Sequence, residues 1–331
     1  MHESIPAKFD DRLMMHFLER AGVDPSFLEN KSNQANAFMP DLCQNNPRLL
    51  ELRRLYHERR TWPDEHSIWK QEFISNDLPL DRFRMDCAYI WQKRDFNSPA
   101  SFVLTFLYLE TLGLGSLLRE LGEDGAFGCF TQPVNGTPAS RDLLDSVCEI
   151  NFLRRMLGEE PLRGKTILDI GAGYGRLAHR MFQAGHSGRI FCTDAIPESA
   201  FLSEFYIKYR NCPDLARMIT LPDLFDTIKP AEIDIAINIH CFSECPYIFI
   251  GWWLRLIAKL EIPCLFIVPN SDSDGGRSLL STERNGARID YSVLVHAAGY
   301  RRVALEPKYA DASVQRFGIS PTHYHFFKRI R

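Results

Sequence analysis

The spacing of apolar residues along this chain changes near residue 160. Before that point they recur at helical intervals, as with Phe102, Phe106 and Leu109. We expect no strand in this first half. After it, short apolar runs alternate with helical segments, which is typical of a parallel sheet with helices between its strands. The pattern therefore predicts a helical domain over 1–160 and an α/β domain over 161–331.

The α/β half is expected to contain seven strands, the last two forming an antiparallel edge. The predicted strands are 166–170, 189–193, 218–221, 233–239, 264–268, 301–305 and 324–328, with helices over 199–209, 246–260 and 292–298. In the first half, three helices are expected to start where Pro or Ser fits the first or the capping position of a helix. These starts are Pro47, Ser98 and Ser140, and helical patterns also cover 11–18 and 62–90.

Composition narrows the class of protein. A net charge of −3 over 331 residues gives no electrostatic basis for binding nucleic acid. Nine cysteines without a C-x-x-C pair favour reduced thiols and a cytoplasmic location. The N-terminus lacks the pattern of a signal peptide, and the longest apolar run, 102–118, is too short to span a bilayer. We therefore expect a cytoplasmic protein with neither nucleic acid nor membrane as a partner.

The segment 165–176 is the strongest candidate for ligand binding. It reads as a buried strand ending in Asp169, followed by glycines at alternate positions from Gly171 to Gly175 and then by a helix. Such glycines let the backbone approach a ligand, and the helix behind them presents free N–H groups. Arg176 stands where a dinucleotide fingerprint has its third glycine, which disfavours a nicotinamide cofactor. The pattern favours a nucleoside cofactor over a glycine-rich turn without function.

Two further strand ends offer groups for a nucleoside, because ligands of open α/β sheets bind outside the carboxyl ends of the strands. Asp194 follows the second strand and could accept hydrogen bonds from two ribose hydroxyls, with Ile196 covering the adenine. After the third strand, Asp223 could accept from the adenine amine and Leu224 could pack on the ring. The alternative for Asp194 is a solvated acid that caps a turn.

The end of the fourth strand is the candidate site of chemistry. His240 could accept the proton of a hydroxyl nucleophile, because imidazole titrates near neutral pH. Glu244 could orient that imidazole or hold an acceptor hydroxyl. The alternative is a structural histidine. Cys241 and Cys245 lack a second pair of metal ligands, and no clear ligand triad occurs elsewhere, so we expect no metal site.

The pattern D-x-G-x-G-x-G from Asp169 to Gly175 resembles motif I of class I S-adenosylmethionine-dependent methyltransferases. The wider segment 162–178, together with 140–146, 194–199 and 238–244, is similar to the putative sugar O-methyltransferase family. The resemblance implies a seven-stranded Rossmann-like sheet, S-adenosylmethionine as cofactor, and a sugar hydroxyl as acceptor in natural-product or polysaccharide biosynthesis. It implies cofactor contacts from Gly171, Gly173, Asp194 and Ile196. We also expect cofactor contacts from Asp169, Ala172, Tyr174, Ala195, Asp223, Leu224 and Asn238, and acceptor contacts from Arg141, Asp142 and Arg176.

Two alternatives to this function stay open. One is a methyltransferase that acts on a non-sugar small molecule at oxygen, nitrogen or carbon. The other is a non-catalytic subunit that keeps the cofactor-binding fold, which the intact glycine turn and Asp194 disfavour. In each case the expected partner is a small molecule bound between the sheet and the helical N-terminal part, and a homo-oligomer is possible.

Overall fold

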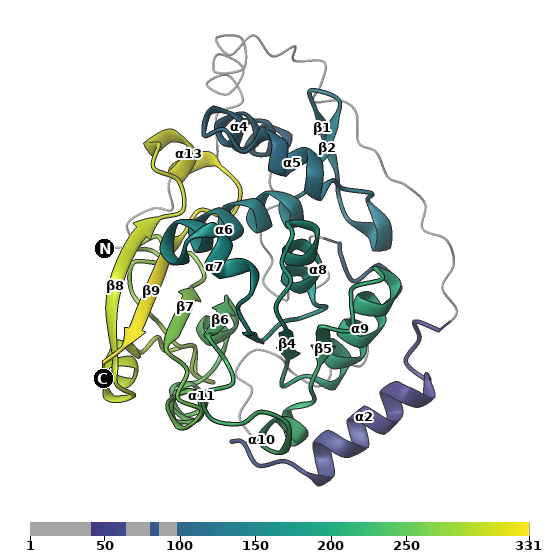
Figure 1. Cartoon of the computed structure of the whole chain (residues 1–331), viewed down its shortest axis with the longest axis vertical. Helices are drawn as coiled ribbons and strands as arrows, with labels where there is room; N and C mark the ends of the chain where they lie inside the picture. Colours follow the sequence, from purple (N-terminus) through teal and green to yellow (C-terminus); the bar gives the residue numbers. More distant parts are fainter. Residues whose placement is uncertain (1–40, 64–79, 86–97, 331) are drawn as a thin grey trace.

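The computed structural model describes residues 41–63, 80–85 and 98–330 (Figure 1). The helix expected at 11–18 and most of the helical region expected at 62–90 lie outside these residues. Within 80–85, Leu80–Arg82 form a short 3₁₀ turn, η2.

The three expected helix starts in the first half are confirmed. α2 (Pro47–Glu58) begins with its proline. Ser98 caps α4 (Pro99–Thr111) and Ser140 caps α6 (Arg141–Leu157), each hydroxyl accepting a hydrogen bond from a main-chain N–H three residues on. The neighbouring helices are α5 (Gly115–Leu121) and α7 (Glu159–Arg163).

A seven-stranded sheet follows, with strand order β5-β4-β3-β6-β7-β9-β8. The first five strands along the chain are parallel, and β9 runs antiparallel between β7 and β8. The expected seven-stranded Rossmann-like sheet and its antiparallel edge are therefore confirmed. The strands are β3 (Ile167–Ile170), β4 (Ile190–Thr193), β5 (Ala216–Met218), β6 (Ile235–Ile239), β7 (Cys264–Val268), β8 (Tyr300–Pro307) and β9 (His323–Arg329).

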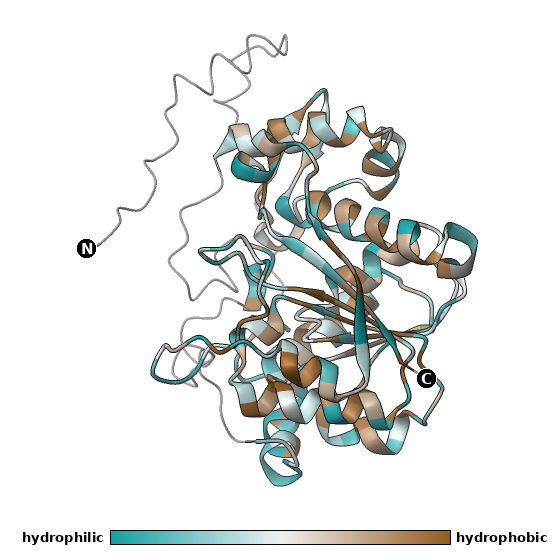
Figure 2. Ribbon diagram, turned by 90° about the vertical axis from the view of Figure 1, so that its left-hand side faces the viewer, coloured by the Kyte–Doolittle hydropathy of each residue, from teal (hydrophilic) through white to brown (hydrophobic). Residues whose placement is uncertain are grey.

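The topology fixes where a ligand can bind. From β3 the chain adds β4 and β5 on one side, and then returns to add β6 and β7 on the other. The carboxyl ends of β3 and β6 therefore flank the switch in strand order, which is the usual ligand crevice of such sheets. Figure 2 shows helices on both faces of the sheet, whose central strands are strongly hydrophobic. The helices that follow β3 along the chain are α8 (Arg176–Gln183), α9 (Pro197–Tyr209), α10 (Leu224–Thr227), α11 (Tyr247–Lys259), α12 (Ser292–Ala297) and α13 (Ala312–Phe317).

Two expectations about strands are wrong. A hairpin of β1 (Gln132–Val134) and β2 (Thr137–Ala139) precedes residue 160. Asn135 and Gly136 both have positive φ, +50° and +75°, which suits a tight hairpin turn. Its strands are too short to show alternation in the sequence. The third large-sheet strand, β5, lies earlier than the predicted 218–221, because the following residues form a 3₁₀ turn that contains a proline.

The hydrophobic core joins the two halves of the chain. One cluster of buried side chains includes residues from α4 and α6 as well as from the sheet. Phe152 on α6, for example, stacks on Phe266 on β7 with ring centroids 5.0 Å apart. The division into domains at residue 160 stays a prediction. In the described part of the chain, no helix combines the length and the apolar character needed to cross a membrane.

Candidate functional site

The glycine loop joins β3 to α8, and its glycines share a positive φ but differ in what surrounds them. Gly171, Gly173 and Gly175 all have positive φ, at +71°, +56° and +83°. A Cβ on Gly171 would lie 2.4 Å from the Cβ of Cys241, so the loop packs directly on the segment after β6. A Cβ on Gly173 would meet no atom within 4 Å. The loop is thus closed against the protein at Gly171 and open beside Gly173.

Asp194 ties this loop to the end of β4. Its carboxylate accepts hydrogen bonds from the N–H groups of Gly173 (3.0 Å) and Ile196 (2.9 Å). Burial raises the pKa of Asp194 to about 7, against the lowering effect of these N–H donors. Each carboxylate oxygen keeps a second lone pair, so the predicted ribose contact is compatible with this role. Ala195, which directly follows Asp194, is half-buried.

Asp169 lies at the carboxyl end of β3 and lines a cavity beside the glycine loop. The residue is 3% exposed, and burial raises the pKa of its carboxyl group to about 7, although Arg176 opposes the rise. A buried carboxyl group of this kind suits a cationic ligand, because a nearby positive charge restores its ionised form.

Replacing Asp169 with asparagine is expected to stabilise the free protein while weakening ligand binding. The folded state keeps this proton between roughly pH 4 and 7, whereas the unfolded chain has lost it, so the contribution of Asp169 to stability falls as pH rises through that window. Above pH 7 the variant should therefore gain about 2 kcal/mol in free energy of unfolding.

Urea unfolding at pH 5 and pH 8 measures the effect of Asp169→Asn, with Asp214→Asn at an exposed position as control. The variant's gain should be smaller at pH 5 than at pH 8, while the control should show no gain at either pH. Calorimetry with S-adenosylhomocysteine should show roughly tenfold weaker binding, if one charged hydrogen bond is lost. An unchanged free energy of unfolding at pH 8 contradicts the interpretation.

An ion-pair cluster beside the loop contains Asp142, which we predicted to contact the acceptor, and Tyr174, which we predicted to contact the cofactor. The Tyr174 hydroxyl donates to Asp142 (2.6 Å), whose carboxylate also accepts from Arg84 and Arg180. Burial alone would raise the pKa of Asp142, but the two guanidinium groups hold it well below its usual range. Asp142 thereby anchors the glycine loop to α6. Its contact with an acceptor stays a prediction.

Arg176 makes a similar internal pair at the start of α8. Its guanidinium group donates to both carboxylate oxygens of Glu149 (2.8 and 3.0 Å) and to the Ser146 hydroxyl (2.7 Å), both on α6. Arg176 also lines the cavity beside Asp169, so its side chain borders both the cavity and α6. Its role in acceptor binding likewise stays a prediction.

A group of potential metal ligands occurs in the same cluster. In the part of the chain that the structure describes, Glu123, Cys129 and Asp142 place possible ligand atoms within 4.8 Å of one another. Arg84 and Arg180 each pair with both carboxylates, at 2.7 to 3.2 Å. A metal cation there would meet two positive charges at close range, so we assign the group to ion pairing.

His240 follows β6 with an unusual backbone. Its φ is +66°, a conformation that is uncommon outside glycine and that clusters at functional sites. Its N–H donates to the carbonyl of Val268 at the end of β7 (2.7 Å). Asn238 supports the turn from inside, since its amide donates to the Ile170 carbonyl (3.0 Å) and accepts from the Phe242 N–H (2.9 Å). The end of β6 is thus tied to both neighbouring strands.

The predicted partner of His240 lies on the same turn, η5 (Cys241–Glu244). The Glu244 carboxylate accepts a hydrogen bond from the Asn270 amide (3.2 Å), which lies just beyond β7. The Asn270 N–H in turn donates to the Ser243 hydroxyl (3.0 Å). Glu244 is therefore held by the segment after β7, and its predicted action on His240 stays a prediction.

One cavity of about 140 Å³ brings several of these groups together at the switch point. Sequence reasoning missed Asp145, which lines it too and pairs with Lys308 and, at 3.6 Å, with Arg141. The spacing of Arg141 and Asp145, one helical turn apart, was the available signal. The cavity lining comprises Phe83, Arg84, Met85, Arg141, Asp145, Asp169, Gly171, Ala172, Gly173, Tyr174, Arg176, Leu177, Ile239 and His240.

The groups predicted for the adenine lie outside that lining, farther along the same edge of the sheet. Leu224 is buried at the start of α10, and Ile196 is 6% exposed. Asp223 pairs with Arg59 and accepts from the Thr220 hydroxyl (2.5 Å). Arg59 comes from the segment just after α2, which we did not connect with this site from the sequence.

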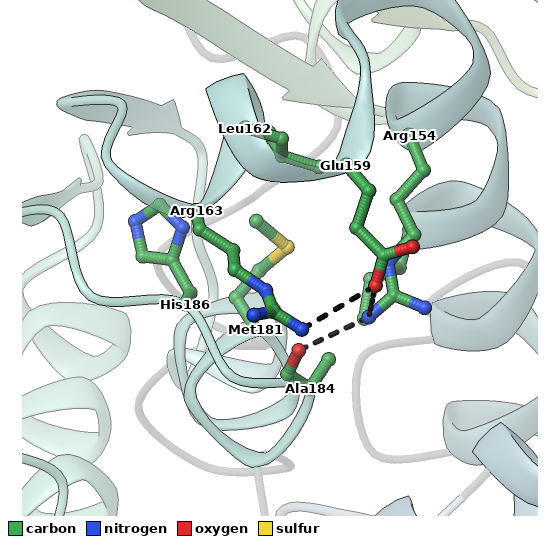
Figure 3. Close-up of a pocket in the computed structure, with 8 residues that line it drawn as sticks. Arg154, Glu159, Leu162, Arg163, Met181, Ala184 and His186 are labelled. Atoms are coloured by element: carbon green, nitrogen blue, oxygen red, sulfur yellow. Dashed lines mark hydrogen bonds and ion pairs between the residues drawn. The ribbon is translucent and has the colours of Figure 1, made fainter.

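A second cavity lies at the opposite, amino end of β3 and does not qualify as a site (Figure 3). Arg154 and Arg163 both pair there with Glu159, and His186 lies beside them. The cavity measures about 10 Å³, which is room for roughly one water molecule. Both arginines are held by Glu159, so we assign the cavity a structural role.

Of the comparisons with known proteins, only the one with solved structures finds matches. No protein-family model matches the sequence, and no curated protein does. Among solved structures, one similar chain is a SAM-dependent methyltransferase from Aquifex aeolicus, with 14% identity, 55% of this chain and 90% of that chain covered, and a TM-score of 0.40. Magnesium protoporphyrin IX methyltransferase from Synechocystis PCC 6803, with bound SAM, shows 13% identity, coverage of 70% and 97%, and a TM-score of 0.42.

A third similar chain is a putative sarcosine dimethylglycine methyltransferase from Galdieria sulphuraria, with 15% identity, coverage of 68% and 97%, and a TM-score of 0.43. Such identities and TM-scores say nothing about the reaction of this protein or its acceptor. Its own strand order, with one antiparallel strand inserted beside the last parallel one, gives this chain the Rossmann-like fold of class I methyltransferases.

Proposed function

We propose that this protein transfers a methyl group from S-adenosylmethionine to a hydroxyl group of a small, sugar-containing acceptor. The observation that carries the proposal is the lining of the switch-point cavity. The open side of the glycine loop, the buried carboxyl group of Asp169 and the strained His240 meet there, at the ends of β3 and β6. Nucleoside ligands of open α/β sheets bind at this place.

The residues present fit the charges of that cofactor. Its ammonium and carboxylate groups find opposite charges in Asp169 and Arg141, which both line the cavity. Asp194 offers acceptors to the ribose hydroxyls from the next strand end. The open space beside Gly173 leaves room for a ligand against the loop backbone. When bound, the cofactor supplies a methyl group on a positively charged sulfur, which is already a strong electrophile.

The protein's part in the reaction is positioning and proton removal. The acceptor oxygen must lie in line with the methyl group, since correct orientation supplies much of the rate enhancement. As the oxygen–carbon bond forms and the sulfur–carbon bond breaks, the hydroxyl proton passes to the imidazole of His240 and then to solvent. The side chains of Arg141 and Asp145 and the ring of Phe83 offer hydrogen bonds and an apolar face to a hydroxyl-rich acceptor.

Calorimetry with S-adenosylhomocysteine tests the first half of the proposal, and micromolar binding is the expected result. Absence of binding by both the cofactor and its demethylated product would refute it. The acceptor is tested by incubating the protein with labelled S-adenosylmethionine and a panel of sugars, nucleotide sugars, glycosides, amines and phenols. Label on a sugar oxygen supports the sugar assignment, whereas label only on an amine or a phenol overturns it and leaves methyl transfer standing.

A further inference from the structure

Helix α2 packs next to α9 (Figure 1), and its Tyr56 reaches the segments just beyond β4 and β5. Arginines in and just after this helix bind acids at the site edge. Arg48 pairs with Glu204 on α9 (2.7 Å), and Arg59 pairs with Asp223 and with Asp226 (3.3 Å). The segment is therefore attached to the elements that surround the predicted adenine position.

Tyr56 is the most deeply placed polar group of α2. Its side chain is 3% exposed, and its ring packs edge-on against Trp62 with centroids 5.7 Å apart. Its hydroxyl donates to the main-chain carbonyl of Asp194 (2.9 Å) and accepts from the N–H of Leu221 (3.3 Å). One phenol thus bonds to the ends of two neighbouring strands.

The two hydrogen bonds of Tyr56 lie just beyond the carboxyl ends of β4 and β5, where the pairing of these strands ends. The last β4–β5 bond joins the Ile219 N–H to the Cys192 carbonyl (2.8 Å). Continued by two residues on each strand, the same register would pair the Leu221 N–H with the Asp194 carbonyl, and the Tyr56 hydroxyl lies between them instead. A main-chain N–H donor beside a carbonyl acceptor is the pair of groups to which the amine and ring nitrogen of an adenine edge can hydrogen-bond. The Tyr56 hydroxyl therefore engages the two main-chain groups with which a purine edge would pair.

We propose that α2 is a displaceable lid that competes with the purine of the cofactor. Docked, it places Tyr56 on the main-chain groups of the purine position and Arg59 on Asp223, the acid predicted to accept from the adenine amine. A nucleoside can then bind only when α2 moves away. The inference rests on the proposed function, because it takes the cofactor to be a nucleoside.

The attachment of the lid combines one buried ion pair, Arg53 with Glu198 on α9 (2.8 Å), which favours the docked state, with exposed pairs that are suited to release. The side chains of Arg48 and Arg59 are 40% and 47% exposed, and Asp226 is 78% exposed. Ion pairs at such positions contribute little and weaken with salt. The buried side chains of Leu49, Leu52 and Tyr56 favour the docked state. A ligand shifts this balance by its preference for the state without the docked lid.

Replacing Tyr56 with phenylalanine is the direct test. The change removes both main-chain bonds and keeps the ring, so the docked state is weakened. Calorimetry should show S-adenosylhomocysteine binding about fivefold tighter than in the wild type, which is the effect of roughly one net hydrogen bond. The matched control is Tyr300→Phe, which removes another buried hydroxyl that donates to a carbonyl, that of Ile262, away from the site.

A second variant covers the case in which Tyr56→Phe fails to fold. Arg59→Gln frees Asp223 from its ion pair and should also tighten binding, whereas Arg189→Gln, which breaks the exposed pair with Glu232, should leave it unchanged. Hydrogen exchange supplies an independent readout in the wild type. Added S-adenosylhomocysteine should accelerate exchange of the α2 amides, and raised NaCl should tighten its binding.

The outcomes separate the lid from the proposed function. If the wild type binds S-adenosylhomocysteine but Tyr56→Phe binds it equally or more weakly, the lid is overturned and the proposed function stands. Slower exchange of α2 in the complex also overturns it, because α2 would then be a wall of the site. Binding by the variants alone supports the lid. If neither the wild type nor any variant binds, the proposed function fails and the lid fails with it.

Discussion

Replacing Gly171 with alanine is expected to abolish S-adenosylhomocysteine binding and to lower the free energy of unfolding by about 3 kcal/mol. The new Cβ would lie 2.4 Å from the Cβ and 2.5 Å from the Sγ of Cys241, so one backbone segment must shift. A φ of +71° adds strain for any residue with a Cβ. Because His240 precedes Cys241, the shift would disturb the proposed base together with the loop.

Two other glycines supply matched controls for Gly171→Ala. Gly173 also has positive φ, but its Cβ would meet nothing within 4 Å, so Gly173→Ala isolates the backbone strain. Gly164 has φ near −91° and open space around it, so Gly164→Ala should be neutral. Thermal unfolding and calorimetry should rank the losses as Gly171, then Gly173, then Gly164.

A double variant assigns the cause of the loss at Gly171. Combining Gly171→Ala with Cys241→Gly removes the clash and keeps the strain, so part of the lost stability should return relative to the sum of the single variants. If Gly171→Ala behaves like Gly173→Ala, the contact with Cys241 has no energetic weight and the interpretation is wrong.

The contact between Gly171 and Cys241 also shows what the sequence could predict and what it could not. The motif around Gly171 follows from local rules, since a buried strand, alternate glycines and a helix each have their own pattern. The position of His240 at the end of a parallel strand follows from the same rules. Which face of the turn after β6 meets the loop depends on packing between distant segments, for which no local pattern exists.

Polar residues at the start of α6 illustrate a second limit. Asp142 has the position and chemistry of a ligand contact in the sequence, yet its carboxylate pairs with Arg84 and Arg180 beneath the loop. Those partners come from separate segments, so the sequence cannot separate a buried ion pair from an exposed binding group. Tyr56 is the opposite case. In the sequence it fits the buried face of an amphipathic helix, yet its hydroxyl bonds to the main chain beyond two strand ends.

Replacing His240 with asparagine is expected to lower kcat by about 10²- to 10⁴-fold, the usual contribution of a general base. Asparagine is the better test than alanine, because it tolerates the positive φ that this position requires. The affinity for S-adenosylhomocysteine should change by less than about threefold, since the loop and Asp194 remain. A loss confined to kcat would separate proton removal from a general disturbance of the cofactor site.

The pH dependence of the rate distinguishes a base from a structural histidine at position 240. With the wild type, kcat should rise with pH as the imidazole loses its proton and then level off, whereas His240→Asn should lose that rise. Glu244→Gln serves as the partner test: if Glu244 orients the imidazole, kcat falls while the rise with pH remains. Full turnover by His240→Asn on the true acceptor would instead mean that the strained turn serves packing, and that the acceptor hydroxyl is positioned without a protein base.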